Sequence, residues 1–122
     1  MSQLKPRDQR TSIRFNKIFR VTVSTEEYAE MDAVARNISA GGMLIETVSP
    51  SPLGSEVRVR FDIPDSQASI VARAEVKNHY VFNYCEDGAP RWARGMGVRF
   101  LEFVEDGEEM LRLSLTKCRT LH

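Results

Sequence analysis

The chain contains few of the residues that support metal, redox or membrane chemistry. Only two cysteines, Cys85 and Cys118, occur among 122 residues, and their spacing matches no metal-binding or redox motif. We expect buried or incidental thiols, although a disulfide between the two remains open. No apolar run approaches the length of a membrane span, and no signal-peptide apolar region follows the N-terminal charges. We therefore expect a soluble, cytoplasmic protein without a transmembrane segment.

The chain also has no excess of either charge. Lysine plus arginine and aspartate plus glutamate both number 17, whereas nucleic-acid-binding domains usually carry a basic excess. We therefore expect neither DNA nor RNA as a partner. The charge is nevertheless uneven, because the first 20 residues hold six basic residues and one acidic residue. Such a basic segment could attract a small anion.

Hydrophobic periodicity predicts a mainly β domain. The clearest alternation lies between residues 57 and 63, where apolar Val57, Val59, Phe61 and Ile63 are separated by charged residues. Similar strand-like patterns cover residues 19–24, 43–48, 70–77 and 96–100, and a polar stretch from about 83 to 94 predicts a long hairpin loop. Leu111, Leu115 and Cys118 then follow helical spacing. These patterns predict one domain, a small antiparallel barrel or sandwich with a C-terminal helix.

The sequence does not support an enzyme. Ser39, Asp32 and His79 are the residue types of a hydrolytic triad, but no nucleophile-elbow pattern surrounds Ser39. His79 and Cys85 lack metal-ligand spacing. We expect no catalytic residue, no bound metal and no cofactor.

Two separated polar motifs are the strongest functional signal. The first is Arg10-Thr-Ser-Ile-Arg14, and the second is Asn37-Ile-Ser39-Ala-Gly-Gly42. Arginine binds guanine O6 and N7 bidentately and also pairs with phosphate. Serine hydroxyls and exposed glycine N–H groups suit phosphate oxygens. Together the two motifs provide chemistry that could hold an anionic guanine nucleotide.

With these motifs the chain resembles the PilZ domain family of bacterial cyclic di-GMP receptors. The resemblance rests on Arg10-x-x-x-Arg14, on Asn37-x-Ser39-x-x-Gly42, and on Gly95-Met-Gly-Val-Arg-Phe100 in the last expected strand. It covers nearly the whole chain. It implies a six-stranded antiparallel β-barrel with a C-terminal α-helix over residues 15–122, preceded by a flexible N-terminal arm over residues 1–14.

The resemblance also implies roles for individual residues. Arg10 and Arg14 would clamp cyclic di-GMP through its guanine Hoogsteen edges and phosphates. Asn37 would contact a guanine or orient the turn, and Ser39 would donate its hydroxyl to the ligand. Gly41 and Gly42 would keep the backbone accessible. The arm would order over the ligand, and this movement would signal to an as yet unidentified protein effector.

Several positions leave alternatives open. Many family members carry arginine directly before the first motif, whereas this chain has Gln9 there and an arginine at Arg7. Base stacking could come from arginine or from Tyr80, or could be missing. Trp92 could pack on the barrel or contact a partner. The motifs also permit a solvated basic arm beside a simple turn, and the alternative function is a PilZ-like interaction module that binds no nucleotide.

Overall fold

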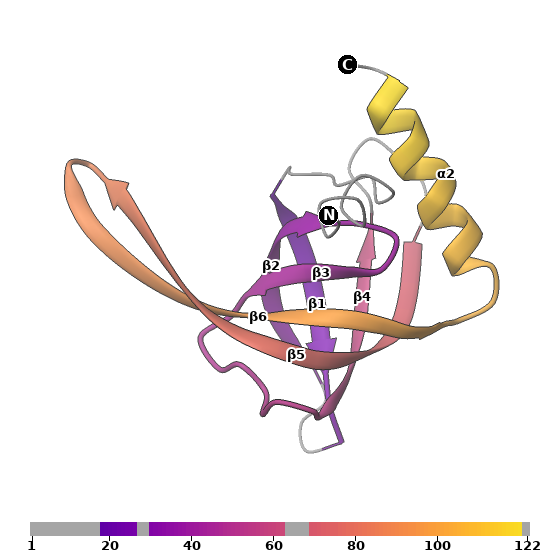
Figure 1. Cartoon of the computed structure of the whole chain (residues 1–122), viewed down its shortest axis with the longest axis horizontal. Helices are drawn as coiled ribbons and strands as arrows, with labels where there is room; N and C mark the ends of the chain where they lie inside the picture. The colour runs from indigo at the N-terminus through magenta and orange to yellow at the C-terminus, as the bar shows by residue number, and fades with distance from the viewer. Residues whose placement is uncertain (1–17, 27–29, 63–68, 121–122) are drawn as a thin grey trace, which may run out of the picture.

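Six antiparallel strands close into a barrel in the order β1-β2-β3-β6-β5-β4. The computed structural model describes residues 18–26, 30–62 and 69–120, and describes side chains as far as residue 116. The elements are β1 Phe19–Ser24, β2 Met31–Ile38, β3 Gly42–Glu46, β4 Glu56–Asp62, β5 Ser69–Glu86, β6 Ala89–Phe103 and α2 Gly107–Thr120. Figure 1 shows the barrel with α2 at one side and the far ends of β5 and β6 extending from the other. The predicted fold class, a mainly β six-stranded barrel with a C-terminal helix, is confirmed.

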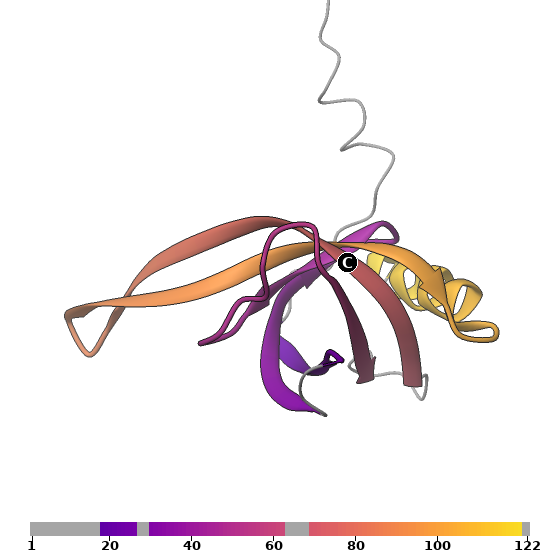
Figure 2. The same ribbon diagram turned by 90° about the horizontal axis from the view of Figure 1, so that it is seen from below.

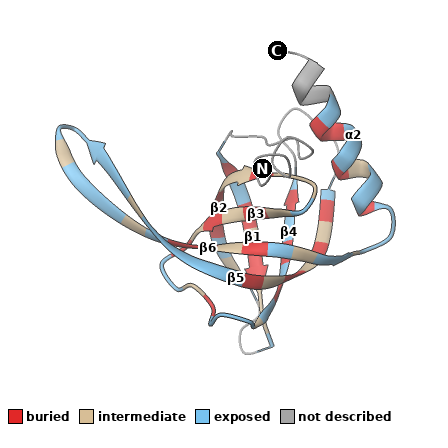
Figure 3. Ribbon diagram, viewed as in Figure 1, coloured by how far each residue is buried: buried red, intermediate tan, exposed pale blue. Residues whose placement is uncertain are grey.

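The barrel core is built from the alternation seen in the sequence. Val57, Val59 and Phe61 of β4 are buried, and the charged residues between them are exposed. Because alternate side chains of a strand point to opposite faces, each strand contributes one apolar face to the interior. In Figure 3 the buried positions therefore gather on the barrel strands and on one side of α2. Leu111 and Leu115 form that side of the helix and belong to the same core cluster.

The prediction of a long hairpin loop from about residue 83 to residue 94 is wrong. β5 runs on to Glu86, β6 starts at Ala89, and the two strands pair continuously from Tyr80–Gly95 to Glu86–Ala89. Only Asp87 and Gly88 form the turn. Both have positive φ, of 55° and 78°, as a two-residue type I′ hairpin turn requires.

This two-stranded extension, residues 80–94, is called the hairpin arm below. Figures 1 and 2 show it projecting from the barrel as a twisted ribbon. Cys85 lies on the arm as an exposed free thiol, so of the two expectations, a buried or an incidental thiol, burial does not apply to this cysteine. The side chain of Cys118 lies outside the described part of the structure.

In the described part of the chain, no helix is both long and apolar enough to cross a membrane.

Candidate functional site

The second polar motif forms the connection between β2 and β3. Asn37 lies near the end of β2, and Gly42 starts β3. The Ser39 N–H donates to the Gly42 carbonyl at 2.9 Å, and the Gly41 N–H donates to Ser39 Oγ at 3.3 Å. Serine commonly stabilises turns through such local bonds. Ser39 therefore has a structural role in the turn, and its hydroxyl still has a proton to donate outward.

A polar pocket of about 240 Å³ lies where this turn meets β5 and β6. Its wall includes Asn37, Ser39 and Gly42 of the motif. Met43 and Leu44, which directly follow Gly42, also line the pocket, and the rest of the wall comes from residues that are far away in sequence: Lys77, Asn78, Tyr80, Gly97 and Val98. The barrel thus brings three of the predicted site residues together, and it adds a cation, an amide and an aromatic ring from β5.

The two motif glycines differ in their surroundings. A Cβ on Gly42 would lie 2.2 Å from the Val98 carbonyl oxygen, whereas a Cβ on Gly41 would meet nothing within 4 Å. Gly42 is therefore needed for the close approach of β3 to β6. Gly41 is exposed and does not line the pocket.

Tyr80 forms part of the pocket wall because β6 carries glycine beneath its ring. A Cβ on Gly97 would come within 3.0 Å of Tyr80 Cε2. The Tyr80 ring also stacks on Phe82, with centroids 6.3 Å apart and an interplanar angle of 28°. Tyr80 remains 42% exposed, so one part of the ring is supported by protein and another faces solvent. This arrangement offers a surface on which a nucleobase could stack.

Two β-bulges adjoin the pocket. The β2–β3 register shifts between Ala35 and Asn37, and the β5–β6 register shifts between Val76 and Asn78. Bulges change the direction of side chains and are over-represented near functional sites. Arg36 and Lys77 are the residues at the shifts. Sequence reasoning missed Arg36, although the buried residues Ala33, Ala35 and Ile38 depart from strict alternation at this point.

The predicted arginine clamp and its neighbours lie outside the described residues. This applies to Arg10 and Arg14, to Arg7, and to the predicted arm over residues 1–14. Within the described wall the cationic group is Lys77, which is exposed.

The three residues that have the side chains of a hydrolytic triad do not line one common pocket. Ser39 lines the polar pocket, Asp32 lines a different hollow, and His79 Nε2 makes a 2.7 Å hydrogen bond with the Ser51 carbonyl. No group of three or more metal-ligating side chains occurs among residues 18–26, 30–62 and 69–116.

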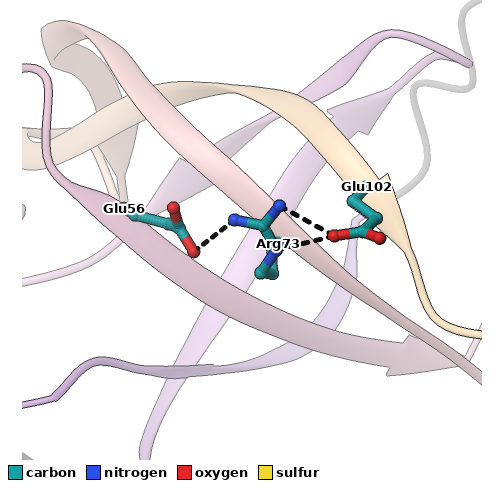
Figure 4. Close-up of polar contacts among 3 residues, drawn as sticks. All are labelled: Glu56, Arg73 and Glu102. Atoms are coloured by element: carbon teal, nitrogen blue, oxygen red, sulfur yellow. Dashed lines mark hydrogen bonds and ion pairs between the residues drawn. The ribbon is translucent and has the colours of Figure 1, made fainter.

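Arg73 lies at the centre of an ion-pair network on the barrel surface. Its guanidinium donates to Glu56 at 2.7 Å and to Glu102 at 2.7 and 3.0 Å, across three neighbouring strands (Figure 4). The hydrogen bond to Glu56, followed by that to Glu102, raises the pKa of Arg73. Arg73 does not line the polar pocket, and the side chains of Arg73, Glu56 and Glu102 are 38%, 50% and 66% exposed, so this network lies on the solvent-exposed barrel surface.

A second, larger hollow of about 730 Å³ lies at the base of the hairpin arm. Trp92, the only tryptophan of the chain, lines it with Tyr84 and Val81 of the arm and Val48 after β3. Trp92 is 71% exposed and does not pack into the barrel.

The closed antiparallel barrel and its C-terminal helix define a small β-barrel domain with a polar pocket at the β2–β3 turn. A family model described as "PilZ domain" matches residues 8–117. The chain belongs to the PilZ domain family. No curated protein sequence matches the chain at a significant level.

Solved structures support the same fold. The PilZ domain with c-di-GMP of YcgR from Escherichia coli has a TM-score of 0.73 and 12% identity, with 90% of this chain and 91% of that chain covered. MotI/DgrA, the inhibitor of motility of Bacillus subtilis, has a TM-score of 0.67 and 19% identity, with 98% and 53% covered. MrkH, described as a c-di-GMP-dependent transcription regulatory factor, has a TM-score of 0.74 and 14% identity, with 91% and 51% covered. This chain therefore spans about half the length of MotI and of MrkH.

Proposed function

We propose that the chain is a cyclic di-GMP receptor that passes ligand occupancy to a protein partner. The observation that carries the proposal is the single pocket that joins Asn37 and Ser39 to Lys77 and Tyr80. An amide suits a base edge, a hydroxyl and an ammonium group suit phosphate, and an aromatic ring suits base stacking. Membership of the PilZ family and the c-di-GMP named for YcgR and MrkH support the choice of ligand.

In this proposal Arg10 and Arg14 complete the site from the N-terminal side. The family match begins at residue 8 and so includes both arginines. Their guanidinium groups would pair with phosphates and with guanine O6 and N7. The proposed signal is a change in the conformation of residues 1–14 on binding, read by the effector. The protein acts as a receptor and adaptor and not as an enzyme.

Calorimetric titration with cyclic di-GMP tests the proposal. The wild type should bind, and Arg10→Ala and Arg14→Ala should each weaken binding roughly tenfold to a hundredfold, because each removes charge-assisted hydrogen bonds worth about 1.5–3 kcal/mol. Arg20→Ala is the matched control, since Arg20 is an exposed arginine of β1 outside the motif, and it should bind like the wild type. Absence of wild-type binding at low salt would refute the function. Equal binding by the wild type and all three variants would refute only the role of Arg10 and Arg14, and the receptor function would stand.

A second function is a PilZ-like interaction module that binds its protein partner without nucleotide. The hairpin arm favours it, because Val81 and Trp92 are 61% and 71% exposed beside the 730 Å³ hollow and exposed apolar patches often mark interaction sites. The same titration separates the two functions: an interaction module would give no heat with cyclic di-GMP, and its partner capture would not change when the nucleotide is added.

A further inference from the structure

The bulge at Arg36 decides which way Asn37 points. Ala35 pairs with Ile45, but Asn37 pairs with Leu44, so Arg36 is the extra residue between them. Ala35 and Ile38 are both buried. In a regular strand alternate residues share a face, so Asn37, two positions after Ala35, would also face the core. A one-residue slip moves every later side chain to the other face. The extra residue therefore turns Asn37 outward into the pocket wall and returns Ile38 to the core.

The Arg36 side chain is held at two points. Its Nη1 donates to Glu46 Oε1 at 2.7 Å, and its Cζ lies 4.9 Å from the centre of the Phe82 ring. The side chains of Arg36 and Glu46 are 31% and 28% exposed. The pair is thus more shielded from solvent than the other ion pairs of the described surface, whose arginine side chains are 38% to 65% exposed. Partial burial strengthens both an ion pair and a cation–π contact.

The same contacts reach the opposite wall of the pocket. Phe82 crosses Gly95 of β6, where a Cβ would lie 2.5 Å from Phe82 Cε2, and Tyr80 crosses Gly97 in the same manner. Tyr80 stacks on Phe82. Contacts therefore run from Arg36, at the bulge beside Asn37, through Phe82 to Tyr80, and both Asn37 and Tyr80 line the pocket.

We propose that Arg36 is a positioning residue of the nucleotide site. By binding Glu46 and Phe82 together, it fixes the bulge that presents Asn37 and the ring pair that presents Tyr80. This proposal rests on the proposed cyclic di-GMP function and adds a residue that does not itself line the pocket. Arg36 sets the distance between the Asn37 amide and the Tyr80 ring. It therefore governs how well the site distinguishes guanine from adenine.

The test compares cyclic di-GMP and cyclic di-AMP by calorimetry on the full chain. Arg36→Ala should weaken cyclic di-GMP about tenfold, as expected when a base contact of about 1.4 kcal/mol is misplaced, and it should weaken cyclic di-AMP less, so that the preference for guanine falls. Arg36→Lys keeps the charge but not the planar guanidinium, and it should recover part of the loss. Arg60→Ala is the matched control. It removes another Arg–Glu pair, with Glu30 at 3.0 Å, and touches neither pocket wall, so neither affinity should change.

A double-mutant cycle separates positioning from a general loss of stability. If Arg36 acts through Asn37, Arg36→Ala should cost much less in an Asn37→Ala background than in the wild type, because coupled residues are not additive. An equal loss in both backgrounds would refute positioning through Asn37, and an equal loss in a Tyr80→Ala background as well would refute the positioning role.

The outcomes distinguish this proposal from the function on which it rests. No binding by the wild type refutes both. Wild-type binding with unchanged affinity and unchanged guanine preference in Arg36→Ala refutes only the positioning role. If thermal unfolding shows that Arg36→Ala is not folded, Glu46→Gln replaces it, since it keeps Arg36 and the side-chain shape. Glu46→Gln should then lower the guanine preference in the same direction, and an unchanged preference would refute the proposal.

Discussion

The two halves of β5 belong to one strand and have opposite surroundings. From Ile70 to Val76 every second residue is buried, and this half pairs with β4 on one side and β6 on the other. From Lys77 to Glu86 every residue is exposed except Phe82, and from Tyr80 onward this half pairs with β6. The first half is a wall of the barrel, and the second is one edge of a two-stranded ribbon.

This difference shows that a continuous hydrogen-bonded ladder does not imply uniform stability. Both halves satisfy backbone groups through β6, but only the barrel half also buries apolar side chains. A two-stranded hairpin is marginally stable in water by itself. The hairpin arm is therefore expected to open more readily than the barrel, and contacts that hold it to the barrel include Arg36 on the Phe82 ring and the Thr47 N–H bond to the Arg94 carbonyl.

The largest expected difference between the two regions comes from apolar truncation. Ile45→Ala should lower the free energy of unfolding by about 2–5 kcal/mol, because Ile45 is fully buried and its truncation leaves a cavity. Val81→Ala on the arm should change it by about 0.5 kcal/mol or less, since Val81 is 61% exposed. Urea unfolding followed by circular dichroism measures both. Equal losses would mean that the arm is covered in solution.

A smaller effect is expected at the motif glycines. Gly42→Ala should cost about 1–3 kcal/mol, because its Cβ would collide with the Val98 backbone and push β3 away from β6. Gly41→Ala is the control, with open space around its Cβ, and its stability should match the wild type. Thermal unfolding of the two variants tests the contrast. A stable Gly42→Ala protein would contradict the close approach of the two strands.

The smallest effect concerns the Arg73 network on the barrel half of β5. Its carboxylate partners raise the pKa of Arg73, so the stability from this shift is fully present below the ordinary arginine pKa and is lost only as pH rises through the higher folded value. Between about pH 6 and about pH 9, the stability difference between wild type and Arg73→Met should therefore stay constant. It should shrink in about 1 M salt, because the network is exposed and screened. Unfolding curves at the two pH values test this, and a difference that grows with pH would contradict it.

Sequence patterns predicted the barrel strands well, because a strand that is buried on one face has apolar residues at every second position. The alternation of Val57, Val59 and Phe61 predicted β4, and the spacing of Leu111 and Leu115 predicted the inner side of α2. The hairpin arm was missed for the same reason. With both sides exposed it needs no apolar alternation, and its Asn83, Asp87, Gly88 and Pro90 are typical of loops.

The pocket could be predicted only in part. The motif containing Asn37 and Ser39 was visible because its residues are close in sequence. Lys77 could not be assigned, because only the β5–β6 pairing brings it to the turn. Base stacking was expected from arginine, from Tyr80 or from neither, and the structure places Tyr80 in the pocket wall. The roles of Arg10 and Arg14 stay predictions.

The closure of the barrel has a consequence for how the chain folds. β3 must pair with β6, which brings Gly42 to Arg99, and β1 must pair with β4, which brings Val21 to Phe61, before the barrel is closed. Such distant pairings place this domain with proteins of high contact order, which fold in about milliseconds to seconds. The hairpin arm joins neighbouring residues through Asp87 and Gly88, and a hairpin of that kind forms in about 1–10 μs. The part of the molecule with the least burial is therefore expected to be the first strand pair sampled during folding, and the closed barrel with its polar pocket to be the last part completed.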